Sequence, residues 1–124
     1  MELMQPRALE VDDDPVTHGY VSDLLSAAGY EAYACADGRE ALAFFLQHAP
    51  FSVLIVDVCL PGMQGPEVVA LLSRASADLR MLFISARPRS PILGQGCGFL
   101  AKPFSETALL GEIARLAETA PGSA

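Results

Sequence analysis

Four positions far apart in the sequence carry side chains that could act together on a metal ion or a phosphoryl group. Each of these positions ends or follows an apolar stretch. They are the three consecutive aspartates 12–14, Asp57, Ser85 and Lys102. Lys102 is the only lysine, since the other seven of the eight basic residues are arginines. Carboxylates that share one pocket repel each other, so their ionised forms need a cation. A divalent ion and Lys102 would together balance three such carboxylates.

The chemistry that these residue types support is metal ligation by oxygen and nucleophilic attack by a carboxylate. Oxygen ligands without a nearby histidine or cysteine select a hard cation, usually Mg2+, with Mn2+ as the alternative. A carboxylate beside such an ion can attack phosphorus and form an aspartyl phosphate. The ion and the lysine would then stabilise the charge on the phosphoryl oxygens, and the hydroxyl of Ser85 could donate a hydrogen bond to one of them.

Short apolar stretches alternate with segments of helical period, which predicts the elements that must position these residues. The predicted strands are 7–13, 30–36, 51–58, 79–86 and 98–102. The predicted helices are 15–28, 37–49, a segment through 68–72, and 105–117, with a loop at 60–65. This alternation predicts a doubly wound α/β fold with a parallel sheet. Ligands bind beyond the carboxyl ends of such strands, so the polar residues are expected to meet there.

Apolar residues at helical spacing mark the side of each predicted helix that is expected to face the sheet. These residues are Val16, Tyr20, Val21, Leu24, Leu25 and Ala28, then Leu42, Phe45 and Leu46, and finally Leu109, Leu110, Ile113, Leu116 and Ala117. Helix boundaries are signalled by Pro15, Gly29, the capping-box pair Asp37 and Glu40, and Ser105. His18 and His48 are expected to lie isolated on helix surfaces, without a catalytic role.

Length and composition limit the class of protein. The chain has 124 residues, of which 52% are apolar, and this fits one domain with a real core. Its net charge of −7 argues against a surface for nucleic acid or anionic membrane. The longest apolar stretch, 51–60, is interrupted by Asp57, and the first residues do not resemble a signal peptide. Cys35, Cys59 and Cys97 share no CxxC spacing, so reduced thiols and a cytoplasmic location are expected.

These motifs resemble the receiver domain of two-component response regulators over about residues 7–117. The resemblance rests on VDDDP at 11–15, IVDVCLPGMQG at 55–65, FISA at 83–86 and GFLAKPF at 98–104. It implies a flavodoxin-like fold whose five parallel strands have the order 2-1-3-4-5. The whole chain is then expected to be a single receiver domain, with 118–124 as a tail or linker.

The resemblance also implies a role for each candidate residue. Asp57 would be the phosphoacceptor, and Asp12 and Asp13 would hold Mg2+ with the backbone carbonyl of Cys59. The remaining roles would be switch residues at Ser85 and Phe99, and phosphate contact by Lys102, which a cis Pro103 would follow. The implied donor is a phosphohistidine on a sensor histidine kinase or a histidine phosphotransfer protein, and the output would act on a separate effector protein.

Three other functions compete with a signalling phosphoacceptor that catalyses only its own phosphotransfer and dephosphorylation. A phosphatase or phosphotransferase of the haloacid dehalogenase type would form the same aspartyl phosphate, but VDDDP lacks the DxDx[TV] spacing and the chain lacks room for a cap. A carrier of FMN is disfavoured because three aspartates would repel the phosphate. A receiver that docks without phosphorylation is disfavoured by the intact acidic pair, acceptor and lysine.

Two features with consequences for the fold depart from the family pattern. Glu10 replaces an apolar strand residue, so it is either solvated or buried with a partner or a raised pKa. Ser85 and Lys102 are only 17 positions apart, and the prolines and glycines in 87–97 allow at most one helical turn. This shortened fourth helix is similar to receivers of hybrid sensor histidine kinases. Arg87 is expected at the mouth of the pocket, where it would modulate hydrolysis of the acyl phosphate.

Overall fold

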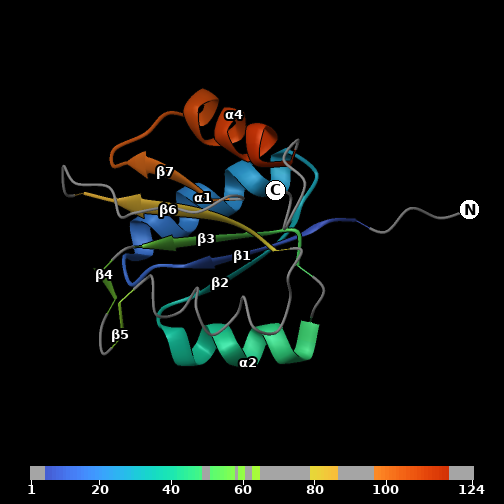
Figure 1. Ribbon diagram of the computed structural model, residues 1–124, viewed down its shortest axis with the longest axis vertical. Coiled ribbons are helices and arrows are strands. Elements are labelled where there is room, and N and C mark those ends of the chain that lie inside the picture. Colours follow the sequence, from blue (N-terminus) through green and yellow to red (C-terminus); the bar gives the residue numbers. More distant parts are fainter. Residues whose placement is uncertain are drawn as a thin grey trace, which may run out of the picture.

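A five-stranded parallel sheet forms the centre of the molecule. The computed structural model describes residues 5–48, 51–57, 79–86 and 97–117, together with the backbone of 59–60 and 63–64. The strands of the sheet are β1 (Arg7–Val11), β2 (Glu31–Cys35), β3 (Val53–Asp57), β6 (Arg80–Ser85) and β7 (Cys97–Ala101). Their spatial order, β2-β1-β3-β6-β7, confirms the predicted order 2-1-3-4-5 (Figure 1).

Helices cover both faces of this sheet. Helices α1 (Pro15–Ala27) and α4 (Glu106–Ala117) lie on one face, and α2 (Gly38–His48) lies on the other (Figure 1). After β3, the strands β4 (Cys59–Leu60) and β5 (Met63–Gln64) pair in an antiparallel manner, so part of the predicted loop forms a short hairpin. The predicted helix through 68–72 and the shortened segment 87–96 lie outside the described residues.

The predicted helix boundaries agree with the hydrogen bonds at the helix ends. The N–H of Glu40 donates to Asp37 Oδ1 at 2.9 Å, while Glu40 Oε1 accepts the N–H of Ala36. Ser105 Oγ accepts the N–H of Ala108 at 3.1 Å at the start of α4. Gly29 follows α1 with a φ of +96°, a backbone conformation that glycine adopts without strain.

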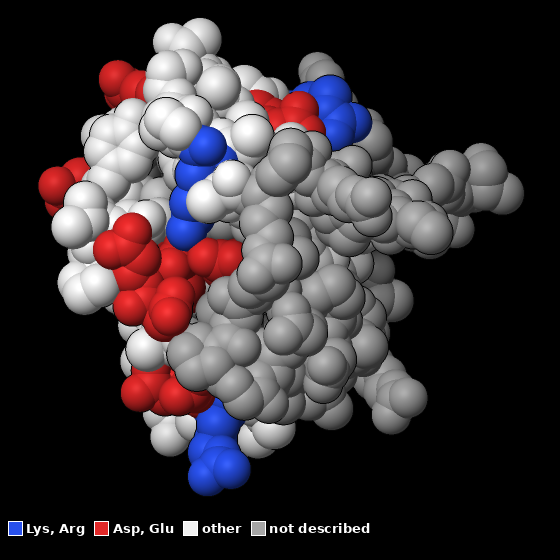
Figure 2. All heavy atoms as spheres, turned by 90° about the vertical axis from the view of Figure 1, so that its left-hand side faces the viewer, with Lys and Arg blue, Asp and Glu red and all other residues white. Residues whose placement is uncertain are grey.

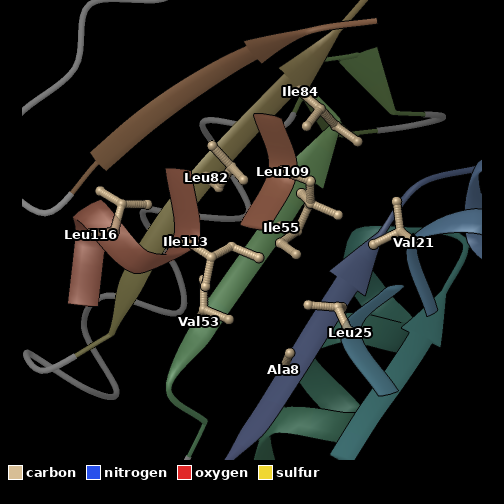
Figure 3. Packing of buried hydrophobic residues seen from close by; sticks show 10 residues of the cluster. All are labelled: Ala8, Val21, Leu25, Val53, Ile55, Leu82, Ile84, Leu109, Ile113 and Leu116. Atoms are coloured by element: carbon tan, nitrogen blue, oxygen red, sulfur yellow. The ribbon is translucent and has the colours of Figure 1, made fainter. Parts of the chain in front are cut away.

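The core has one apolar layer on each face of the sheet. Every residue of β3 is buried, as the apolar residues before Asp57 predict for a central parallel strand. On the side of α1 and α4, Figure 3 shows residues of these two helices meeting residues of β1, β3 and β6 in one cluster. Its members are Ala8, Val21, Leu25, Val53, Ile55, Leu82, Ile84, Leu109, Ile113 and Leu116. Within the described residues, no helix is long and apolar enough to cross a membrane.

Some apolar residues expected to face the sheet are exposed instead. Val16 and Tyr20 in α1 are 79% and 42% exposed, and Leu46 in α2 is 72% exposed. Helix α1 meets the sheet through Val21 and Leu25, and a residue five positions before Val21 lies about 140° away around the helix axis. Two helix-end residues predicted to lie inside are exposed as well: Ala28 and Ala117.

Candidate functional site

The carboxyl edge of the sheet brings together residues that are far apart in the sequence. Strand β1 ends at Val11, two residues earlier than predicted, so Asp12 and Asp13 lie just beyond it. Asp57 is the last residue of the neighbouring strand β3, and Lys102 directly follows β7. This edge faces the viewer in Figure 2, where acidic side chains gather beside a basic one.

Lys102 joins the two buried carboxylates of the site. Its Nζ donates to Asp12 Oδ2 at 2.8 Å and to Asp57 Oδ2 at 2.9 Å. Asp12 is fully buried, Asp57 is 9% exposed, and the side chain of Lys102 is 17% exposed. The carboxylate of Asp57 therefore lies at the bottom of the site, with an ammonium group beside it and limited contact with water.

Asp12 is held by hydrogen bonds to both its backbone and its side chain. Its N–H donates to the carbonyl of Cys35, the last residue of β2, at 3.0 Å. Its Oδ1 accepts the N–H of Asp14 at 2.9 Å, and Asp14 in turn caps α1 by accepting from Val16 N–H and the hydroxyl of Thr17. The turn between β1 and α1 is therefore fixed around the carboxylate.

Burial and charge act in opposite directions on these groups. Burial raises the pKa of Asp12 and is only partly offset by the hydrogen bonds from Lys102 and Asp14. Burial also disfavours the ammonium of Lys102, but its hydrogen bonds to Asp12 and Asp57 outweigh this effect and raise its pKa. Lys102 is therefore a cation at neutral pH, and this single ammonium group stands beside a cluster of three carboxyl groups.

The acidic residues can also hold a metal ion. Asp12, Asp13 and Asp57 each offer a carboxylate oxygen within 4.8 Å of the others. Asp13 is exposed, so this side of the cluster is open to water. An oxygen-only set of donors with an open side fits Mg2+, which keeps several of its water ligands in protein sites.

The remaining predicted residues are placed to different extents. Ser85 is buried at the end of β6, and its carbonyl accepts the N–H of Lys102 at 2.7 Å. Phe99 lies in β7 opposite Phe83 of β6 and is partly buried. Cys59 begins β4, two residues after the end of β3. Arg87, predicted at the mouth of the pocket, lies outside the described residues. The Lys102–Pro103 peptide bond is cis, as predicted.

Glu10 belongs to the interior below the site. It is fully buried in β1, on the same face of the strand as Ala8, two residues before Asp12. Neither of its carboxyl oxygens has a hydrogen-bond partner among the described residues. Burial, followed by repulsion from Asp12, raises its pKa to about 9. Of the alternatives that the sequence allows, solvation is therefore excluded, and Glu10 is buried with a raised pKa and uncharged at neutral pH.

The histidines do not lie isolated as predicted. His18 in α1 is partly buried, and its Nε2 lies 3.0 Å from the carbonyl of Cys35, which also accepts the N–H of Asp12. His48 stacks on Tyr33 with ring centroids 4.6 Å apart. The helical pattern could not reveal either contact, because the partners of both histidines, the carbonyl of Cys35 and the ring of Tyr33, belong to strand β2.

Comparison with known proteins agrees with this geometry. Residues 8–114 match the family described as the response regulator receiver domain. Response regulator MprA of Mycolicibacterium vanbaalenii is 35% identical over 124 residues, which cover 95% of this chain and 53% of that protein. The chain spans about half or less of the length of the curated relatives that it matches.

Solved structures show the same similarity. Chemotaxis protein CheY4 of Vibrio cholerae has a TM-score of 0.81 and 36% identity, over 91% of this chain and 99% of that one. Response regulator protein TrrA of Thermotoga maritima, in complex with Mg2+ and BeF, has a TM-score of 0.78 and 26% identity, over 90% and 98%. Because the family match covers most of its length, the chain belongs to the response regulator receiver domain family and serves as a receiver in two-component signalling.

Proposed function

We propose that Asp57 is the phosphoacceptor of this receiver and that Asp12, Asp13 and Asp57 hold the Mg2+ ion that the reaction requires. The observation that carries this proposal is the position of Asp57 between Lys102 Nζ, at 2.9 Å, and the carboxylates of Asp12 and Asp13. The bound TrrA structure, which holds Mg2+ and BeF, supports the same assignment by similarity.

The proposed transfer of the phosphoryl group from a phosphohistidine to Asp57 is a nucleophilic displacement at phosphorus. An oxygen of the Asp57 carboxylate forms the new O–P bond, and the P–N bond of a phosphohistidine breaks, leaving its electron pair on the imidazole nitrogen, which then takes up a proton. Lys102 stabilises the negative phosphoryl oxygens from a fixed position beside Asp57. The metal ion, when bound, supplies further charge stabilisation. Ser85 and Phe99 would change position with the phosphoryl group, and the backbone of Cys59 would complete the metal site.

Phosphorylation of the purified protein tests the assignment of Asp57. Wild type is incubated with Mg2+ and acetyl phosphate and then measured by intact mass. It should gain one phosphoryl group, and Asp57→Asn should gain none. Asp23→Asn removes an exposed aspartate of α1 and should react like wild type. Equal labelling of Asp57→Asn and wild type would refute the assignment.

The same site would make this protein a signalling phosphoacceptor and not an enzyme that turns over other substrates. Asp57 accepts from a phosphohistidine and loses the group to water, so one protein molecule consumes one phosphoryl group per cycle. Multiple turnovers of p-nitrophenyl phosphate, abolished by Asp57→Asn, would favour the phosphatase alternative instead.

The donor protein is proposed to dock on an apolar surface next to the site. Val16, Tyr20 and Phe104 line a cavity of about 380 Å³ whose wall also includes Lys102. Tyr20 donates a hydrogen bond to the carbonyl of Phe104 at 3.2 Å, which ties α1 to the loop after β7. A phosphohistidine that reaches Asp57 must be carried by a surface that covers this region, and burying Val16 and Tyr20 would favour such a complex.

Comparing two phosphoryl donors separates docking from chemistry. The protein donor is the histidine kinase that phosphorylates wild type fastest in a panel of purified kinases. Val16→Asp should slow transfer from this kinase about tenfold or more and leave the reaction with acetyl phosphate unchanged. Leu46→Asp alters an equally exposed apolar residue of α2, and it should affect neither reaction. An unchanged rate from the kinase in Val16→Asp would exclude this surface.

A further inference from the structure

We infer that His18 is a positioning residue for the metal site, because its imidazole holds the strand ends that orient Asp12. This inference rests on the proposed role of Asp12 as a metal ligand. The ring nitrogen Nε2 lies 3.0 Å from the carbonyl oxygen of Cys35. A carbonyl oxygen only accepts hydrogen bonds, so Nε2 carries the proton and donates it.

The acceptor of this bond is the same atom that anchors the backbone of Asp12. The N–H of Asp12 donates to the Cys35 carbonyl at 3.0 Å, just beyond the last paired residues of β1 and β2. Terminal positions of a sheet open more easily than interior ones, because only one side is supported by further pairing. His18 adds a second donor at this position and connects α1, β1 and β2 through one oxygen atom.

The position of the Asp12 carboxylate depends on this connection. Its Oδ1 is held by the N–H of Asp14, which caps the helix that carries His18, and its Oδ2 is held by Lys102. Both the strand end and the helix start are therefore fixed relative to each other before a metal ion binds. If the His18 bond is lost, metal binding must order the Asp12 carboxylate, so the affinity for the ion falls.

Three substitutions of His18 test the inference through the affinity for Mg2+. A net contribution of about 0.5 to 1.5 kcal/mol for one hydrogen bond corresponds to about a twofold to twelvefold change in affinity. His18→Ala should weaken Mg2+ binding by this factor in calorimetric titration. His18→Gln, whose amide N–H can reach as far as Nε2, should restore most of the affinity, and His18→Asn, whose amide is shorter, should not.

His48→Ala provides the matched control for a purely structural effect. His48 is the other histidine of the chain, is also partly buried, and stacks on Tyr33 away from the acidic cluster. Its replacement should lower the melting temperature without changing the affinity for Mg2+. If the affinity of both alanine variants falls in proportion to their loss of stability, or if His18→Ala binds Mg2+ like wild type, the inference is wrong.

A spectroscopic measurement examines the hydrogen bond itself. Long-range 1H–15N spectra at neutral pH should show His18 with its proton on Nε2, and a dominant Nδ1–H tautomer would overturn the inference. Absence of Mg2+ binding by wild type would overturn the proposed metal site together with this inference. Normal binding and phosphorylation of wild type, with unchanged affinity in His18→Ala, would overturn this inference alone.

Discussion

Glu10 is a buried acid that the fold tolerates at a cost in stability. It lies in β1 between β2 and β3, so both edges of its strand are paired, and the described residues offer its carboxyl group no hydrogen bond. The sequence left its burial open because an apolar stretch does not reveal whether its strand is central or at an edge. In contrast, Asp57 and Lys102 could be placed from the sequence, since each stands where an apolar stretch ends.

The raised pKa of Glu10 predicts a pH-dependent loss of stability. Below pH 4.5 the carboxyl is protonated in both the folded and the unfolded chain and contributes no pH dependence. Between pH 4.5 and about 9 the unfolded chain releases this proton while the folded chain retains it, so the free energy of unfolding falls as pH rises. At pH 7 this loss amounts to about 3 kcal/mol.

Urea unfolding in EDTA at pH 5, 6, 7 and 8 measures this contribution. Glu10→Gln removes the ionisable group, so its stability should decline less than that of wild type over this range. Glu106→Gln, which replaces an exposed glutamate of α4, should follow wild type. Parallel pH dependences for Glu10→Gln and wild type would contradict the prediction.

At the scale of elements, the packing of α4 on β7 has no room for a side chain at Gly98. A Cβ at this position would lie 2.6 Å from Glu112 Oε2 and 3.3 Å from Leu116 Cδ1. Glu112 is held by two hydrogen bonds from Arg115, each of 2.8 Å. Strand β7 carries Phe99 and is followed directly by Lys102, so this close packing helps to hold Lys102 in position at the site.

Replacing two glycines of this region by alanine should have opposite effects. Gly98→Ala must displace the carboxylate of Glu112 and is expected to lower the free energy of unfolding by about 1 kcal/mol. Gly111→Ala lies within α4, where a Cβ meets nothing within 4 Å, and should raise it by about 0.5 to 1 kcal/mol. Chemical denaturation compares them, and a stabilising Gly98→Ala would show that the packing adapts more easily than expected.

The sequence predicts the arrangement of the strands correctly but not which residues of the helices are buried. Alternating strands and helices, with polar residues at the strand ends, predict a parallel sheet and the edge that carries the site, and the resemblance to receiver domains adds the strand order. Val16 and Tyr20 were assigned to the core because apolar spacing does not distinguish a face against the sheet from one that is left exposed. The prediction that His18 lies isolated is wrong for a different reason, since its contact depends on how far α1 is rotated over β2.

At the scale of the whole molecule, the proposed metal site would link the binding of Mg2+ to the free energy of unfolding. A ligand that binds only the folded chain stabilises it, by about 2.7 kcal/mol at a hundred times its dissociation constant. Mg2+ should therefore raise the melting temperature of wild type. Asp13→Asn changes the exposed residue of the proposed metal site, so it should melt like wild type in EDTA but gain much less from Mg2+. An equal gain in both proteins, measured by scanning calorimetry, would exclude Asp13 from the site.

Lys102 lies 90 positions from Asp12 and 45 from Asp57 in the sequence, although its ammonium contacts both. A nascent chain that has been synthesised only to the end of β3 thus contains Asp12, Asp13 and Asp57 but not the positive charge of Lys102. The ammonium reaches them only when β7 has joined the sheet, through contacts of long sequence separation, which form slowly during folding. The site is therefore completed only after β7 has joined the sheet, and a chain without β7 lacks the ammonium group that the proposed transfer to Asp57 uses.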